Sequence, residues 1–351
     1  MQDINSQNIQ RFSNMLDTAG NIAIVTHMKP DGDAIGSSMA MYHYLRMSGK
    51  DSKVVLPHIP QPSISFLTEK YPEAVVIHES DSKGAESAIL NADTIICLDF
   101  NAFHRTDALE SALNQSSAIK ILIDHHLNPA REAFDLIFSE QEISSASELL
   151  FHILMSTSTI GHQAHRLPEE ARDALMTGMT TDTNNFGNSV YPSTLKMASE
   201  LLAAGTDRDR ILSLIYNRFS ENRLRLLGHM MKDLLTVTGD GVAYIVLDSK
   251  TQAEYGIQEG DTEGFVNMPL SIENVIMSIL LKEDDGKARV SIRSKKGTSA
   301  NRCAMLHFNG GGHENAAGGR LRIPEDIRNI SEAAAYIESH THTFIKNETC
   351  K

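Results

Sequence analysis

Aspartate and histidine side chains follow three apolar, β-branched runs in the first half of the chain, at the point where each run ends. Runs of this length and composition are typical of buried parallel strands. Because the carboxyl ends of parallel strands meet at one edge of a sheet, we expect these polar side chains to converge on one crevice. The runs and the residues after them are 22–26 with His27, 94–98 with Asp99, and 119–123 with Asp124, His125 and His126.

Three further aspartates lie in segments that could reach the same crevice. Asp31 and Asp33 stand two apart in a loop whose proline and glycine favour a tight turn. Asp182 follows a helical pattern over residues 171–180. A single aspartate in such a place is usually a helix N-cap, and Asp33 could be one. The joint occurrence of acids at several strand ends is what favours a metal site.

So many carboxylates in one place need compensating positive charge, because like charges a few ångströms apart cannot all stay ionised. Divalent cations are the natural compensation. Ligation by carboxylate and imidazole without thiolate favours Mn²⁺, with Mg²⁺, Co²⁺ and Fe²⁺ as alternatives, and argues against structural zinc. These carboxylate and imidazole side chains are more ligands than one catalytic ion with open positions needs. The sequence therefore predicts a centre of two divalent ions, with one aspartate bridging them.

The elements that must position these residues form an α/β pattern. In the first half of the chain, short apolar runs alternate with helical patterns, which is typical of a parallel sheet flanked by helices. A length of 351 residues predicts roughly two domains. The expected strands are residues 22–26, 53–56, 74–77, 94–98, 119–123 and 136–138, and the expected helices include 34–47 and 144–155.

The pattern turns wholly helical and highly charged over residues 192–235, and a turn-rich break follows at 238–241. Beyond the break we expect a second, smaller α/β unit. Its expected elements are strands over 242–247 and 288–293, a helix over 274–281, and a frayed tail from residue 340, in which His340 and His342 are solvated and bind no metal.

The order of these motifs resembles the DHH phosphoesterase family, which is named for the triplet that stands here at 124–126. Residues 27–37 match the first motif of the family, 98–99 the second and 181–183 the fourth, and 308–319 resemble the signature of the DHH-associated substrate domain. Within the family the chain is most similar to the nanoRNase and pAp phosphatase subgroup, often called exopolyphosphatase-like. The resemblance implies a DHH catalytic domain that binds the metals over 1–191, a helical connector over 192–238 and a DHH-associated substrate domain over 239–345.

The resemblance also implies a role for each residue at the strand ends. One Mn²⁺ would be held by His27, Asp31 and Asp99 and the other by Asp33, Asp99, His125 and Asp182. His126 would face the phosphate, and Asp124 would orient the histidine pair from behind.

The chain departs from the family pattern at one position of the fourth motif. Many members have glycine where this chain has Asn184; if that position needs a positive φ, asparagine is the best substitute.

The second domain carries the residues expected to bind substrate. Three successive glycines let the backbone approach an anion closely and expose N–H groups to it. An arginine on the strand over 288–293 could hold a terminal phosphate through two guanidinium nitrogens. The predicted substrate contacts are Arg293, Gly310, Gly311, Gly312, His313 and Asn315.

The chemistry implied is phosphoester hydrolysis at two metals, in which hydroxide from a water of lowered pKa attacks phosphorus. By the resemblance, the substrates are short oligoribonucleotides, 3′-phosphoadenosine 5′-phosphate (pAp), or both. The alternatives are a manganese pyrophosphatase or exopolyphosphatase-like enzyme, a phosphodiesterase of linear or cyclic dinucleotides, and, outside the enzymes, a nucleotide-sensing protein. The preferred substrate, the polarity of RNA degradation and the oligomeric state, with a homodimer as one option, stay open.

The composition of the chain argues against several classes of binding partner. The chain has 32 Lys+Arg against 45 Asp+Glu, a net charge of −13, which argues against a broad basic face for long DNA or RNA. With 6% aromatic residues and no tryptophan it offers little surface for stacking bases, which disfavours a RecJ-like DNA exonuclease. No membrane-spanning run or signal peptide is visible, so a cytoplasmic protein is expected. The three cysteines, Cys97, Cys303 and Cys350, are expected to be reduced thiols.

Overall fold

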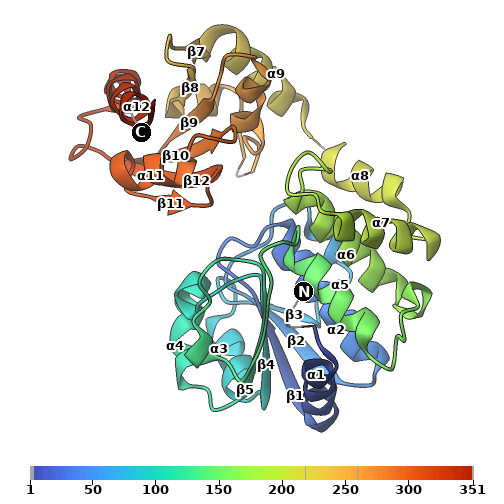
Figure 1. Ribbon diagram of the computed structural model, residues 1–351. Coiled ribbons are helices and arrows are strands. Elements are labelled where there is room, and N and C mark those ends of the chain that lie inside the picture. The colour runs from blue at the N-terminus through green and yellow to red at the C-terminus, as the bar shows by residue number, and fades with distance from the viewer. Residues whose placement is uncertain (1–3, 218, 259, 350–351) are drawn as a thin grey trace. The chain divides into compact units, whose positions relative to one another are not determined.

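The computed structural model describes residues 4–217, 219–258 and 260–349, and the chain divides into two compact units, Met1–Arg218 and Phe219–Lys351 (Figure 1). The first unit is built on a six-stranded parallel sheet and the second on a six-stranded mixed sheet. The predicted α/β class, with a parallel sheet in the N-terminal part, is confirmed.

The sheet of the first unit has the strand order β3-β2-β1-β4-β5-β6, and every neighbouring pair is parallel. The chain moves outward from β1 to β3 and then returns to the other side of β1 with β4. In such a sheet the crevice for a ligand lies where the order reverses, beyond the carboxyl ends of β1 and β4. All six predicted strands are present, as β1 (Asn21–Val25), β2 (Asp51–Leu56), β3 (Val75–Ile77), β4 (Thr94–Leu98), β5 (Ile119–Asp124) and β6 (Leu136–Ser139).

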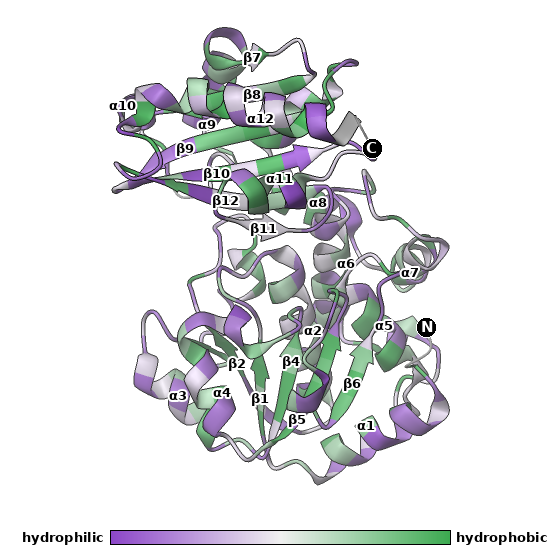
Figure 2. Cartoon of the chain, turned by 60° about the vertical axis from the view of Figure 1, so that its left-hand side comes forward, coloured by the Kyte–Doolittle hydropathy of each residue, from purple (hydrophilic) through white to green (hydrophobic). Residues whose placement is uncertain are grey.

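Helices cover both faces of this sheet. Ile22 and Ile24 of β1 join the core with α1, α2, α5 and α6, whereas Ala23 and Val25 join a second core with α3 and α4. Strands buried on both faces are hydrophobic along their whole length, as the green of β1 and β4 shows in Figure 2. The helices are α1 (Ser6–Thr18), α2 (Gly32–Met47), α3 (Ser82–Leu90), α4 (Glu110–Gln115), α5 (Ala146–Ser156), α6 (Glu169–Asp182), α7 (Pro192–Ala203) and α8 (Arg208–Tyr216).

Two glycines let α2 and α6 pack backbone against backbone. A Cβ atom on Gly36 would lie 2.6 Å from the carbonyl oxygen of Ala174 and 2.9 Å from Cα of Gly178. Since α2 begins beside Asp33 and α6 ends at Asp182, this close packing sets the separation of the two helices that carry these acids.

The mixed sheet of the second unit has the order β11-β12-β10-β9-β8-β7, in which only β8 and β9 run parallel. The helices α11 and α12 pack on one of its faces and α9 contributes to a core on the other. The elements are α9 (Glu221–His229), β7 (Thr236–Val237), β8 (Val242–Leu247), α10 (Ser249–Glu254), β9 (Met277–Asp284), β10 (Lys287–Ser294), α11 (Ala300–His307), β11 (Gly311–Gly312), β12 (Ala316–Arg322) and α12 (Ala333–Thr349).

Two predictions for this unit are wrong. The segment 274–281, predicted as a helix, supplies residues 277–281 of β9. These five residues are all buried, and the strand pairs with neighbours on both sides. A short apolar run can be a strand or a buried helix, and here the pairing partners decide.

The predicted frayed tail is instead part of α12. Phe344 and Ile345 pack in the core of the second unit, and His340 stacks on Tyr336 with ring centroids 3.8 Å apart. His342 Nδ1 lies 2.6 Å from Asp240 Oδ2. Burial of these apolar side chains explains why the segment is helical.

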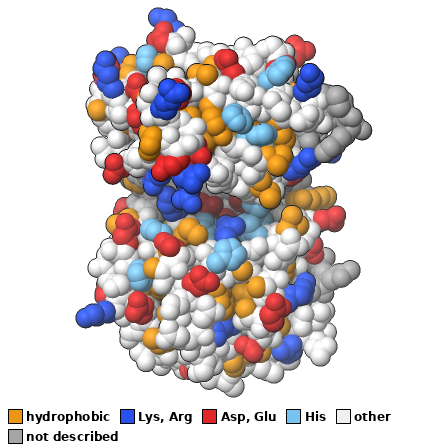
Figure 3. Space-filling view, turned by 90° about the vertical axis from the view of Figure 1, so that its left-hand side faces the viewer, with side chains coloured by type: hydrophobic (Ala, Val, Ile, Leu, Met, Phe, Trp, Pro, Cys, Tyr) orange, Lys and Arg blue, Asp and Glu red, His pale blue; other side chains and the backbone are white. Residues whose placement is uncertain are grey.

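Cys97 and Cys303 are buried and unpaired, and Cys350 lies outside the described residues. No helix in the described part of the chain has the length and apolar character needed to cross a membrane. On the face shown in Figure 3, acidic and basic side chains are interspersed over both units.

Candidate metal centre

The side chains that follow β1, β4 and β5 lie together, as predicted. His27 Nε2 is 3.4 Å from Asp99 Oδ2 and 3.8 Å from Asp31 Oδ1. His125 Nε2 is 3.4 Å from Asp99 Oδ1 and 3.6 Å from Asp182 Oδ2. Asp99 therefore stands between two histidines.

These residues form overlapping groups whose potential ligand atoms all lie within 4.8 Å of one another. The group of His27, Asp31 and Asp99 matches the first predicted ligand set. A second group joins Asp33, His125 and Asp182, and Asp99 contacts His125 in a third group, which also includes His126.

Asp99 occupies an unusual backbone position directly after β4. Its φ is 63°, a left-handed conformation that costs a non-glycine residue free energy and is found most often at functional sites. Its amide donates to Ile123 O at 3.1 Å, which continues the pairing of β4 with β5 and directs the side chain into the crevice. The residue is 2% exposed, and its Oδ1 has no hydrogen-bond partner among the described residues. A buried carboxylate oxygen in this state fits a site that binds a cation.

The histidines are oriented by groups behind them. His27 Nδ1 lies 2.8 Å from the carbonyl oxygen of Met28, which can only accept, so Nδ1 carries the proton and Nε2 is directed at the aspartates. His126 Nδ1 lies 2.7 Å from Asp124 Oδ1, and Asp124 is fully buried. Imidazole held in this way from behind is typical of metal and phosphate sites.

The N-cap of α2 is Asp31 and not Asp33, which corrects the alternative considered from the sequence. Asp31 Oδ1 accepts from the amides of Asp33 and Ala34 at 3.0 and 3.1 Å. Asp33 is 1% exposed and accepts from the amides of Ala146 and Ser147 at 2.6 and 2.9 Å. The second contact depends on the start of α5, which is far away in the sequence.

The electrostatics are those expected of crowded acids without a cation. Burial raises the pKa of Asp33 to about 7 and raises that of Asp182 well above its usual range. Burial also acts on Asp99 and His125, but their mutual interaction prevails, so the pKa of Asp99 is lowered and that of His125 is raised to about 10. The cluster therefore retains protons that a divalent cation would displace.

The loop after Asp182 confirms the expectation for Asn184, whose φ is 46°. The next two residues, Asn185 and Phe186, have φ values of 57° and 65°. Arg208 of α8 bonds the side-chain oxygen of Asn185 and lies 5.3 Å from the centroid of the Phe186 ring. These contacts fix a loop that leaves the site directly after Asp182.

Two of the three glycines predicted to bind phosphate, Gly310 and Gly312, are needed for packing within the second unit. A Cβ on Gly310 would lie 1.9 Å from Gly318 O, and one on Gly312 would lie 2.6 Å from Ala316 O. The amide of Gly310 donates to Ala304 O at 3.2 Å and that of Gly312 to Asn301 Oδ1 at 2.9 Å. These two amides are thus already bonded within the unit.

Two further predicted substrate contacts are also engaged locally. The guanidinium of Arg293 donates to Ile292 O at 2.9 Å. The side-chain amide of Asn315 donates to Ser294 Oγ at 3.0 Å and to Lys295 O at 3.1 Å. Asn315 therefore holds the turn after β10, a role that the sequence did not indicate.

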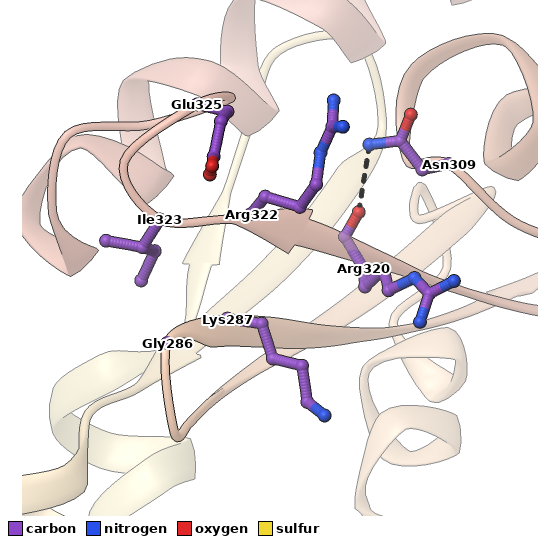
Figure 4. Close-up of a pocket in the computed structure, with 7 residues that line it drawn as sticks. All are labelled: Gly286, Lys287, Asn309, Arg320, Arg322, Ile323 and Glu325. Carbon is purple, nitrogen blue, oxygen red and sulfur yellow. Dashed lines mark hydrogen bonds between the residues drawn. The ribbon is translucent and has the colours of Figure 1, made fainter.

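A cavity of about 430 Å³ in the second unit has a basic lining (Figure 4). Its Arg322 is engaged by Asp326 at 3.0 and 3.1 Å. None of the predicted site residues lines it. The lining is Gly286, Lys287, Asn309, Arg320, Arg322, Ile323 and Glu325.

Sequence reasoning missed the two residues that define the start of α5, whose amides hold Asp33. Ser145 is the N-cap of α5 and Glu148, three residues later, is fully buried. The spacing Ser-x-x-Glu before an apolar run is a known signature of a helix start and could have identified them.

Comparison with known proteins matches both units. The family described as "DHH family, N-terminal domain" matches residues 21–179, and the one described as "DHHA1 domain" matches residues 239–339. The crystal structure of an exopolyphosphatase-related protein from Bacteroides fragilis is 35% identical, covers 99% of each chain and superposes with a TM-score of 0.91.

Two curated relatives carry a more specific name. A probable bifunctional oligoribonuclease and PAP phosphatase NrnA from Streptococcus mutans is 29% identical over 87% of this chain and 92% of the relative. The bifunctional oligoribonuclease and PAP phosphatase NrnA of Thermus thermophilus is 28% identical over 91% of this chain and 92% of the relative.

Proposed function

The chain belongs to the DHH family of phosphoesterases, and on that premise we propose that it uses two divalent ions, Mn²⁺ before Mg²⁺, Co²⁺ or Fe²⁺, to hydrolyse short oligoribonucleotides and pAp. The observation that carries the proposal is the position of Asp99 between two groups of ligands, with one buried oxygen that has no hydrogen-bond partner among the described residues. The names of the two NrnA relatives support this choice of substrates.

The residues present suit two cations. His27, Asp31 and Asp99 would hold one, and Asp33, Asp99, His125 and Asp182 the other. When bound, such ions neutralise the phosphate oxygens and lower the pKa of the attacking water. The four aspartates bring up to four negative charges, which two divalent ions balance.

The protein's own groups position the substrate. The carboxylate of Asp124 accepts from the amide of His126 at 3.2 Å and contacts its ring at 2.7 Å, which fixes the imidazole beside Asp99. In the proposal His126 contacts a non-bridging phosphate oxygen, and this contact strengthens as charge develops there. In the second unit, Arg293, Gly310, Gly311, Gly312, His313 and Asn315 stay the predicted substrate contacts, and the cytoplasmic location and the homodimer stay predictions.

The test is a calorimetric titration of metal-free protein with Mn²⁺, followed by hydrolysis assays on pAp, a diribonucleotide, a cyclic dinucleotide and pyrophosphate. We expect two equivalents of Mn²⁺ and turnover of the first two substrates. Asp99→Asn removes the shared ligand charge and should abolish both binding at two sites and turnover. Asp93→Asn, at the opposite end of β4, is the matched control. Two bound ions and full turnover in Asp99→Asn would contradict the bridging role, and preferred turnover of pyrophosphate or the cyclic dinucleotide would favour the alternatives.

A further inference from the structure

The carboxylate of Asp33 is held by the first turn of α5 and not by its own helix. Both of its oxygens accept backbone N–H groups there, from Ala146 and Ser147. A helix N-terminus carries partial positive charge, so it stabilises the carboxylate while fixing its direction. The placement of this side chain therefore depends on where α5 begins.

The start of α5 is anchored by Glu148, whose side chain is fully buried. Its Oε2 accepts from the amide of Ser144 at 3.1 Å and is also bonded by the hydroxyl of Ser144. Burial alone would raise the pKa of Glu148, but the nearby imidazole of His152, 3.6 Å away, and hydrogen bonds from Ser144 and Thr194 lower it to about 2. The carboxylate is therefore ionised and bonded to the residue that precedes the N-cap of α5.

The same oxygen also reaches the segment that follows Asp182. Thr194 Oγ1 donates to Glu148 Oε2 at 2.7 Å and accepts from the amide of Tyr191 at 3.1 Å. Thr194 lies in the first turn of α7, which begins after the loop that leaves Asp182 (Figure 1). Glu148 thus joins the start of α5, which holds Asp33, to the end of the loop that follows Asp182.

We infer that Glu148 is a positioning residue for the group of Asp33, His125 and Asp182, acting through the amides of α5 and through Thr194. This inference rests on the proposed function, because it assigns Glu148 to one of the two proposed ion positions. Among the contacts described, neither the amides of α5 nor Thr194 bonds a side chain of the group of His27, Asp31 and Asp99. Loss of Glu148 should therefore weaken one ion and spare the other.

The decisive variant is Glu148→Leu, which keeps the volume but leaves three donors without an acceptor. Removing a residue that orients metal ligands typically lowers metal affinity by about 10- to 100-fold. We expect that loss for one Mn²⁺ equivalent in a titration of the metal-free protein, with the other equivalent unchanged. Glu148→Gln retains one oxygen that can accept from Ser144 and Thr194, so it should restore most of the affinity.

The matched control is Asp173→Leu. Asp173 is a buried acid of α6 that pairs with Arg210, and among the contacts described its carboxylate is bonded neither to α5 nor to Thr194. The Asp173→Leu variant should be less stable than wild type, but its affinity for one Mn²⁺ equivalent should not fall selectively. If Glu148→Leu fails to fold, Thr194→Val, which removes a single donor, provides the same comparison.

The outcomes separate the two proposals. Wild-type protein that binds fewer than two ions contradicts the proposed function. Wild-type protein that binds two, with the same two affinities in Glu148→Leu or, if that variant does not fold, in Thr194→Val, overturns the role of Glu148. An equal loss of affinity for one Mn²⁺ equivalent in Asp173→Leu overturns the role of Glu148 as well, because the loss would then follow from destabilisation alone.

Discussion

Asp124 Oδ1 lies 2.7 Å from Nδ1 of His126, and Asp124 Oδ2 accepts the backbone amide of the same histidine at 3.2 Å. The fully buried carboxylate of Asp124 therefore fixes both the ring and the backbone of His126. Asp124 itself belongs to none of the groups that could hold an ion among the described residues. Its role can therefore be separated from metal binding.

Asp124→Asn should lower kcat by about 10- to 100-fold while the protein still binds two Mn²⁺. The asparagine amide keeps the shape of the carboxylate but lacks its charge. It would present an N–H donor either to the ring or to the backbone amide of His126. The measurement is kcat at saturating Mn²⁺, with metal content determined on the same sample. Asp135→Asn, directly before β6, is the control, since its side chain accepts from the amide of Lys120 at the other end of the sheet. Unchanged kcat in Asp124→Asn would refute the orienting role.

Gly36→Ala should weaken both stability and metal binding. The new methyl group would meet Ala174 O and Gly178 Cα and push α2 away from α6, which separates Asp33 from Asp182. Overpacking of this kind costs about 1–3 kcal/mol. Urea unfolding and Mn²⁺ titration measure the two effects. Gly228→Ala is the control, because a Cβ there meets no atom within 4 Å; a loss of equal size in the control would contradict the prediction.

Substitutions of Asn184 should follow its positive φ of 46°. Asn184→Gly should preserve or raise the free energy of unfolding, whereas Asn184→Val should lower it by about 1–2 kcal/mol, because β-branched residues are strained in the left-handed region. Asn188→Val tests an exposed asparagine of the same loop that lacks a positive φ. Equal stabilities of the two Asn184 variants in urea unfolding would show that the backbone of this loop differs from the one described.

Stability should fall at mildly acid pH because of His43. This side chain of α2 is 5% exposed and packs edge-on against Tyr71, and burial lowers its pKa to about 4. The folded pKa lies below the unfolded value of about 6.5, so the unfolded state binds the proton first. The contribution of His43 to the free energy of unfolding is complete above pH 6.5 and is lost as the pH falls toward 4.

The measurement is the free energy of unfolding in urea at pH 8 and at pH 5. His43 should account for a loss of about 2 kcal/mol between these values, and His43→Phe should lack that part of the loss. His104→Gln, an exposed histidine of the same unit, should behave as wild type. An identical loss in His43→Phe and wild type would show that His43 does not control this pH dependence.

The parallel strands could be predicted because their signal is local. Runs such as residues 94–98 are rich in β-branched and apolar residues, which suits burial on both faces, and the strand observed has the same bounds. The polar residues that end these strands, Asp99 and His125 among them, follow directly in the chain. Once the strands are parallel, those residues must meet at one edge.

Segments with weaker local signals were assigned wrongly. Residues 274–281 are apolar enough for either a helix or a strand, and the two neighbours of β9 decide between them. The helix α12 owes its order to the burial of side chains such as Phe344 in the core of the second unit. The parallel neighbour of β9, β8, and the strands that α12 packs against lie far from these segments in the sequence.

The sequence by itself determined which residue types gather at the carboxyl edge of the parallel sheet, since the strands and their ends follow from local pattern. Tertiary structure decided what each of them contacts: that Asp31 caps α2, that Asn315 holds a turn, and that Asp33 is bound by amides 113 and 114 residues away. The physical reason is that hydrophobic pattern is encoded along the chain, whereas a buried carboxylate takes its donors from whichever backbone the fold brings within about 3 Å of it.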